Sequence, residues 1–157
     1  MYQRRVFIIA GLVLALDQLT KLLAVKFLEF KGEKQVAGNF IKLGFARNPG
    51  AAFSFATGST IIFTVLAAVV CIVIIRSSRT LTHGGWAIAL GALLGGALGN
   101  LSDRIFRSPG VFRGHVVDFI EFPHYPLFNA ADSAIVLSAL SMIYFSFRGI
   151  ELSDRND

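Results

Sequence analysis

Four long apolar stretches dominate the chain, and polar residues gather between them. The stretches run from about Val6 to Leu28, Thr60 to Ile75, Trp86 to Leu101 and Phe128 to Phe147. A helix needs roughly 20 apolar residues to cross the ~30 Å hydrocarbon core of a bilayer. The pattern therefore predicts an all-α membrane protein, a bundle of four transmembrane helices, with one membrane-embedded domain over residues 1–157.

The segment between the first and second stretches alternates between apolar and polar side chains. Ile41, Leu43 and Phe45 fall on one side of an extended chain, and Lys42 and Gly44 fall on the other. This period of two predicts a short strand or hairpin outside the bundle. The segment between the third and fourth stretches is rich in Pro, Gly and aromatic residues, which is typical of a loop at a bilayer interface.

The amino-acid composition supports a location in the bilayer and limits the kinds of partner that the chain is expected to bind. Hydrophobic residues make up 54% of the chain, charged residues 16%, and the mean hydropathy is +0.63. The net charge is +5, but the basic residues flank apolar segments and form no patch interleaved with aromatic residues. We therefore expect lipid headgroups as partners and do not expect nucleic acid. Cys71 is the only cysteine, which excludes an internal disulfide and a metal site built on thiolates.

Basic residues do not settle the orientation in the membrane. Four spans place both termini on the same side as the short basic turn that follows the second span. Six arginines fall on that side: Arg4, Arg5, Arg76, Arg79, Arg148 and Arg155. Eight basic residues fall on the other: Lys26, Lys31, Lys34, Lys42, Arg47, Arg104, Arg107 and Arg113. The excess of positive charge that marks cytoplasmic loops is therefore missing.

Two features inside the spans predict close helix packing. Gly91, Gly95 and Gly99 recur every four residues, a spacing that lets helix backbones approach each other. Asp17 and Lys21 lie one helical turn apart, and charged residues inside a span usually face the bundle interior as pairs. We interpret this pair as a structural ion pair that supports the site.

Polar residues converge on one end of the predicted bundle. In an alternating topology, the end of the first span, the segment before the second, the end of the third and the start of the fourth share one membrane face. The side chains concerned are Asp17, Asn48, Asn100, Asp103, Arg104, Asp118, Asn129 and Asp132. This face is the predicted functional site.

Asp118 and Asp132 are the candidates for chemistry, because the short segment between them can fold back and bring them together. Two adjacent carboxyls share one proton, so one can activate water while the other polarises a carbonyl. A structural interpretation stays open: Asn129 would cap the fourth helix with Asp132 bonding back to it, and Asp118 would be a solvated loop acid. No serine triad or zinc motif is present, and no metal is expected.

Five segments resemble, in order and spacing, the motifs of bacterial lipoprotein signal peptidase, also called signal peptidase II. They are LDQLTK (16–21), NPGAAF (48–53), GNLSDR (99–104), GHVVDF (114–119) and FNAADS (128–133). The resemblance implies that Asp118 and Asp132 are catalytic. It implies supporting roles for Asp17, Lys21, Asn48, Asn100, Asp103, Arg104 and Asn129. The segment 105–113 is longer than in many members of that family.

The resemblance implies an intramembrane aspartic endopeptidase without a cofactor. Its expected substrates are prolipoproteins carrying a diacylglyceryl-modified cysteine, cut on the N-terminal side of that cysteine. The expected location is the bacterial cytoplasmic (inner) membrane, with both termini cytoplasmic and the active site near the outer leaflet. A monomer in contact with membrane lipids is expected.

Two other functions remain possible from the residues alone. Acids inside a membrane often mark the path of an ion or proton transporter or channel, and a polar edge can also bind a partner helix in an assembly subunit. Against a transporter, no inverted repeat is visible and the acids lie at one end of the bundle rather than at its midplane.

Overall fold

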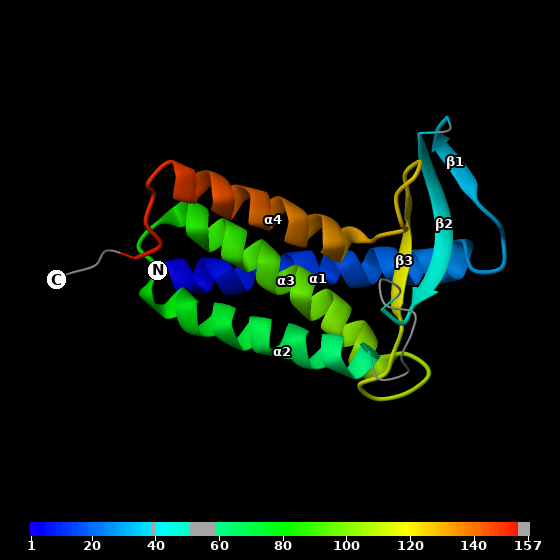
Figure 1. Ribbon diagram of the computed structural model, residues 1–157, viewed down its shortest axis with the longest axis horizontal. Helices are drawn as coiled ribbons and strands as arrows, with labels where there is room; N and C mark the ends of the chain where they lie inside the picture. The colour runs from blue at the N-terminus through cyan, green and yellow to red at the C-terminus, as the bar shows by residue number, and fades with distance from the viewer. Residues whose placement is uncertain (39, 51–58, 154–157) are drawn as a thin grey trace.

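The computed structural model describes residues 1–38, 40–50 and 59–153, which form a helical bundle with a small sheet across one end (Figure 1). The helices are α1 (Tyr2–Phe27), α2 (Ser59–Ser77), the short 3-10 helix η2 (Ser78–Thr80), α3 (Gly84–Phe106) and α4 (Ala130–Phe147). The strands are β1 (Lys34–Ala37), β2 (Ile41–Asn48) and β3 (Val116–Glu121). Four helices are long and apolar enough to cross a membrane, which confirms the predicted fold class.

Helix α3 is the centre of the bundle and contacts α1, α2 and α4. Within an apolar window of 18 residues, 56% of the residues of α3 are buried, against 11% in α4. Helix α3 therefore packs on protein, and α4 faces outward. The glycines of α3 allow α1 to approach. A Cβ added at Gly91 would lie 2.9 Å from the carbonyl oxygen of Val6, and one added at Gly95 would lie 2.7 Å from that of Ala10. The packing role predicted for this spacing is confirmed.

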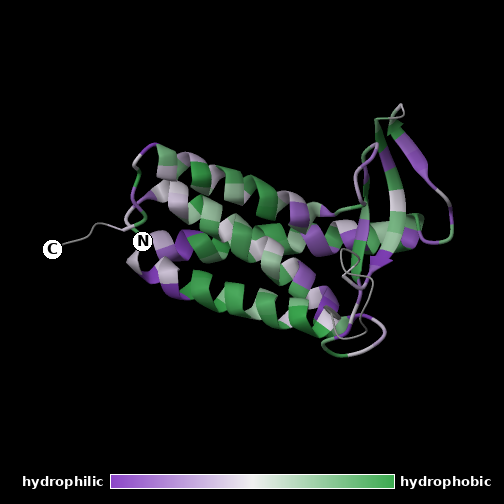
Figure 2. Ribbon diagram, in the orientation of Figure 1, coloured by the Kyte–Doolittle hydropathy of each residue, from purple (hydrophilic) through white to green (hydrophobic). Residues whose placement is uncertain are grey.

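The outer surface of the bundle is apolar. Figure 2 shows hydrophobic residues along the middle of the helices and hydrophilic residues toward the helix ends, while the sheet carries both kinds. Large side chains such as Leu12, Leu66 and Leu137 are exposed along the helices. A surface of this kind is stable when lipid covers it, as expected of a multi-pass membrane protein.

The sheet is antiparallel in the order β1-β2-β3. Ala46 of β2 pairs with Asp118 of β3, and Asn48 pairs with Val116. Val117 and Phe119 pack with residues near the end of α1 in a small apolar cluster. The predicted hairpin is confirmed, but the sequence did not predict β3, because its pairing partner lies about 70 residues earlier in the chain.

Two helix boundaries differ from the expected spans in ways that matter for the site. Helix α3 continues to Phe106 instead of ending near Leu101, so Asp103 and Arg104 are fixed on its last turns. Helix α4 begins at Ala130, because Asn129 is its N-cap.

Candidate active site

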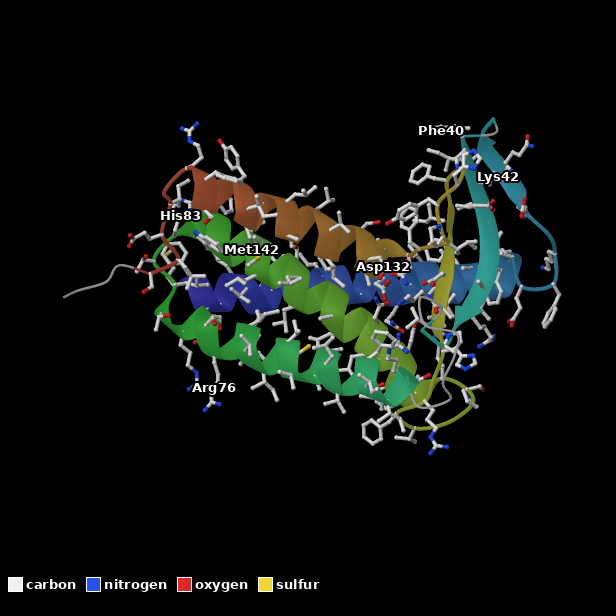
Figure 3. All side chains as sticks on the ribbon, in the orientation of Figure 1. Phe40, Lys42, Arg76, His83, Asp132 and Met142 are labelled. Carbon is white, nitrogen blue, oxygen red and sulfur yellow. The ribbon has the colours of Figure 1, made fainter. Side chains whose placement is uncertain are left out.

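The polar side chains predicted to converge do so where the bundle meets the sheet, at the place marked by Asp132 in Figure 3. Five of these eight are buried, Asp17, Asp103, Arg104, Asp118 and Asn129, and so is Lys21, the predicted partner of Asp17. The other three, Asn48, Asn100 and Asp132, are partly buried. Buried polar groups are costly without partners, so the hydrogen bonds at this junction show how it is held together.

Asp118 lies on β3 and accepts a hydrogen bond at each carboxyl oxygen. The Asn48 Nδ2 donates to its Oδ2 at 2.8 Å, and the Asn129 Nδ2 donates to its Oδ1 at 2.6 Å. The amide of Asn48 is oriented by the backbone N–H of Gly50, which donates to its Oδ1 at 2.8 Å. The remaining part of the NPGAAF motif, residues 51–53, lies outside the described residues.

Asp132 lies in the first turn of α4 and is also held at both oxygens. The backbone N–H of Asn129 donates to its Oδ2 at 3.2 Å, and the Asn129 side chain accepts from the Asp132 N–H at 2.9 Å, forming a capping box. The Asn100 Nδ2 donates to the Asp132 Oδ1 at 2.8 Å. The predicted capping role is confirmed, and Asn129 joins the two aspartates through its backbone and its side chain.

Lys21 is fully buried and is joined to this pair through Asn100, which contacts both Lys21 and Asp132. Its ammonium is 2.9 Å from the Asp17 Oδ2, 2.9 Å from the Asp103 Oδ2 and 2.9 Å from the Asn100 Oδ1. Asp17 in turn accepts from the backbone N–H of Ala131 at 2.9 Å. The predicted Asp17–Lys21 ion pair is confirmed, and it also ties α1 to α3 and α4.

Asp103 connects the bundle to the strand that carries Asp118. Its Oδ2 accepts from the backbone N–H of Val117 at 3.1 Å, one residue before Asp118. Its Oδ1 accepts from the Arg107 Nε at 2.6 Å and from the Gln18 Nε2 at 3.2 Å. Sequence reasoning assigned no role to Gln18 or Arg107, because their inward direction depends on helix rotation.

Arg104 is a cation of the site that has a hydrogen-bond donor without a partner among the described residues. The residue is 9% exposed, and its guanidinium lies over the Phe63 ring, 5.5 Å from the centroid. Its Nη1 is buried and has no hydrogen-bond partner among the described residues. Its charge acts on Asp118, Asp103 and Asp132, so it contributes positive potential to the junction.

Burial changes the acidity of Asp118. Removal from solvent is the largest cause and raises the pKa of this carboxyl from 3.8 to about 6. The negative charge of Asp132 acts in the same direction, whereas the hydrogen bonds from Asn48 and Asn129 oppose the rise. Asp118 is therefore able to exchange a proton near neutral pH, as acid-base chemistry requires.

The donor set of this junction suits proton transfer better than metal binding. Within residues 1–38, 40–50 and 59–153, no group of three or more His, Cys, Asp or Glu side chains could hold a metal ion. A hollow of 510 Å³ lies elsewhere, near Glu29, Glu33 and Glu121, and neither Asp118 nor Asp132 lines it. The expected absence of a metal stays a prediction.

Comparison with known proteins gives a consistent result. The family model described as signal peptidase (SPase) II matches residues 9–148. The lipoprotein signal peptidase of Rhodococcus jostii (strain RHA1) is 50% identical over 152 residues, which cover 96% of this chain and 77% of that protein. The lipoprotein signal peptidase of Streptomyces coelicolor is 51% identical over 145 residues, covering 92% and 71% respectively.

Solved structures resemble the whole fold. A bacterial membrane enzyme determined by the in meso method at 1.9 Å resolution superposes with a TM-score of 0.80 at 26% identity, covering 91% of this chain and 92% of that one. A second, at 2.3 Å resolution, gives 0.79 at 25% identity, with 97% and 93% covered.

Proposed function

Because this chain belongs to the signal peptidase II family, whose members remove signal peptides from prolipoproteins, we propose that it does so as an aspartic endopeptidase with Asp118 and Asp132 as its catalytic pair. The observation that carries the proposal is the position of Asn129, which hydrogen-bonds to both carboxyls at the junction of bundle and sheet. None of the relatives described above supports the transporter alternative.

One shared proton on the pair fits the charges of the site. Two close carboxyls resist double ionisation, and burial already raises the pKa of Asp118 to about 6. The balance of charges in the site also favours one shared proton. The site holds four carboxyls and three cations, so one proton makes it neutral: Asp17, Asp103, Asp118 and Asp132 face Lys21, Arg104 and Arg107.

The proposed reaction needs only this pair and a water molecule. The ionised carboxyl takes a proton from water as the water oxygen bonds to the scissile carbonyl carbon, and the protonated carboxyl gives its proton to the carbonyl oxygen. When the C–N bond breaks, the first carboxyl protonates the leaving nitrogen and the second recovers its proton. The pair thus returns to its starting state. Asn48, Asn100 and Asn129 hold the carboxyls, and the unused Arg104 donor is available to a substrate carbonyl.

The finer details of substrate and location are also proposals. The substrate is a prolipoprotein with a diacylglyceryl-modified cysteine, cut on the N-terminal side of that cysteine, and the apolar flank of the bundle holds its signal helix and acyl chains. The enzyme is a single membrane-embedded domain and a monomer in the bacterial inner membrane. Met1 lies at the end of the bundle opposite the sheet (Figure 1), so the termini and the site face opposite membrane surfaces. With the termini cytoplasmic, as we propose, the active site lies near the outer leaflet.

Cleavage of a lipidated peptide by the purified protein tests this function. A synthetic signal peptide ending in a diacylglyceryl cysteine and a short mature segment should be cut directly before that cysteine, as read by mass spectrometry. Cleavage at another bond, or none in folded protein, would contradict the proposal.

Activity should not depend on a metal ion, because the site offers hydrogen-bonded carboxyls without a zinc-type ligand set. Incubation with a chelator, followed by removal of the chelator, should leave the initial rate within about twofold of the untreated enzyme. Loss of cleavage after chelator treatment, with recovery when zinc is added, would contradict the carboxyl-pair mechanism.

The rate should depend on pH through Asp118. The pair is active with one proton and inactive once both carboxyls are ionised, so kcat/KM should fall as pH rises through the Asp118 pKa of about 6. The Asn48 amide lowers that pKa, and Asn48→Ala should therefore move the alkaline limb to higher pH. Profiles of kcat/KM for both proteins check this, and a flat wild-type profile from about pH 5 to pH 8 would contradict it.

A further inference from the structure

A second cavity adjoins the proposed catalytic pair on the side facing lipid. Its volume is 410 Å³, within the range of about 300–1,000 Å³ that is usual for small-ligand sites. The lining residues are Phe122, Tyr125, Phe128, Asp132, Ser133, Val136 and Leu137. We call this cavity the α4 groove.

One wall of the α4 groove is a packed set of aromatic rings. The rings of Phe122 and Phe128 stack with centroids 5.4 Å apart, and Tyr125 meets Phe128 edge-on at 5.8 Å. Phe40, from the hairpin, contacts Phe122 with ring centroids 5.5 Å apart. Figure 3 shows Phe40 at the tip of the sheet, at the same end of the molecule as Asp132, so the aromatic set extends toward that tip. These mutual contacts make the wall a preformed surface.

The opposite wall is the outward face of α4. Val136 is 53% exposed and Leu137 is 64% exposed, and α4 is the least buried of the four spans. The groove is therefore open to the bilayer along its length. Its polar end is formed by Asp132 and Ser133.

The lining favours an acyl chain over a peptide. A peptide backbone carries N–H and C=O groups that are costly to bury without partners in an apolar site. Beyond Asp132 the lining offers two hydroxyl side chains, Tyr125 and Ser133, and the Ser133 hydroxyl already donates to the Asn129 carbonyl at 3.1 Å. An acyl chain brings no such groups.

We propose that the α4 groove seats one acyl chain of the diacylglyceryl-cysteine and so places the scissile bond against Asp132. This inference rests on the proposed function and adds the location of the lipid. The chain enters from lipid, which is as apolar as the groove, so its burial contributes little hydrophobic free energy. The groove therefore acts through fit and position, and its effect should appear in kcat/KM for substrates with long chains.

Filling the groove tests the proposal. Two substrates with one peptide sequence would carry dipalmitoyl or dibutyryl glyceryl groups, and the measured quantity is the ratio of their kcat/KM values. Leu137→Trp and Val136→Trp should lower this ratio by about tenfold, through loss of the long-chain substrate alone. Leu66→Trp is the matched control, since Leu66 is 56% exposed on α2 and does not line the groove; its ratio should equal that of the wild type.

The other outcomes overturn the proposal. Equal losses for both substrates would place the peptide in the groove, and an unchanged ratio would show that the groove takes no part. If neither tryptophan variant folds, Leu137→Ala removes part of the wall instead and should lower the ratio by about threefold; an unchanged ratio there counts against the proposal equally. Asp132→Asn separates the two claims. If only the catalytic pair is wrong, this variant still cleaves both substrates. If only the groove proposal is wrong, this variant is inactive and the tryptophan variants keep the wild-type ratio.

Discussion

Asparagine in place of Asp132 is expected to lower turnover by three or more orders of magnitude while the protein stays folded. The substitution keeps the shape of the side chain and removes the group that accepts and returns a proton. If Asp132 were only part of the helix cap, asparagine there should cost less than ~2 kcal/mol of stability and leave turnover nearly intact. Initial rates of lipopeptide cleavage and thermal unfolding in detergent separate these cases.

Asp118→Asn should behave in the same way, although its hydrogen bonds come from side-chain amides instead of a cap. Both oxygens of Asp118 accept an amide N–H, from Asn48 and Asn129. An asparagine must present its own NH2 to one of these donors, so some loss of stability, about 1–3 kcal/mol, accompanies the loss of turnover. More than about a tenth of wild-type turnover in either variant corresponds to only ~1.4 kcal/mol in the barrier and would contradict the assignment.

Lys21→Met is expected to cause the largest loss of stability, about 3–5 kcal/mol. The ammonium is fully buried and lies 2.9 Å from a carboxylate oxygen of Asp17 and of Asp103. Methionine fills a similar volume but leaves two buried carboxylates without this cation. Replacing Asp17 and Lys21 together with a neutral pair should be milder, because one of the uncompensated charges is removed as well.

Lys42→Met is the matched control for this prediction. The Lys42 ammonium lies 3.6 Å from Glu33, and these side chains are 28% and 58% exposed. Solvent screens such a pair, so its loss should cost less than ~1 kcal/mol. Denaturant unfolding of both variants in the same detergent gives the comparison, and equal losses would mean that the Lys21 cluster contributes no more than a surface pair.

The sequence predicted the helices well because each span is a long run of mostly apolar residues, which is a local signal. The cap formed by Asn129 and Asp132 could also be predicted from the sequence, because its hydrogen bonds join residues three positions apart. Strand β3 could not be predicted in this way, because it forms by pairing with β2. Asn48 and Asp118, which hydrogen-bond to each other, are 70 positions apart in the chain. No local pattern records a contact of that kind.

The same limit explains the supporting residues that the sequence left without a role. Gln18 follows Asp17 directly and bonds to Asp17, to the Gly99 carbonyl and to Asp103. Its direction depends on how α1 is rotated against α3. Gly91 and Gly95 mark the face of α3 that α1 approaches, but no pattern around Gln18 itself shows that its side chain points toward that face.

Turnover of the double variant, Asp118→Asn with Asp132→Asn, compared with that of each single variant, tests the central claim most directly. Residues that act as one catalytic unit lose activity together, so the double variant should cleave the lipidated peptide about as slowly as either single variant. Two acids with independent structural roles would instead multiply their separate losses. A double variant slower than either single one by the product of the two factors would contradict the catalytic pair.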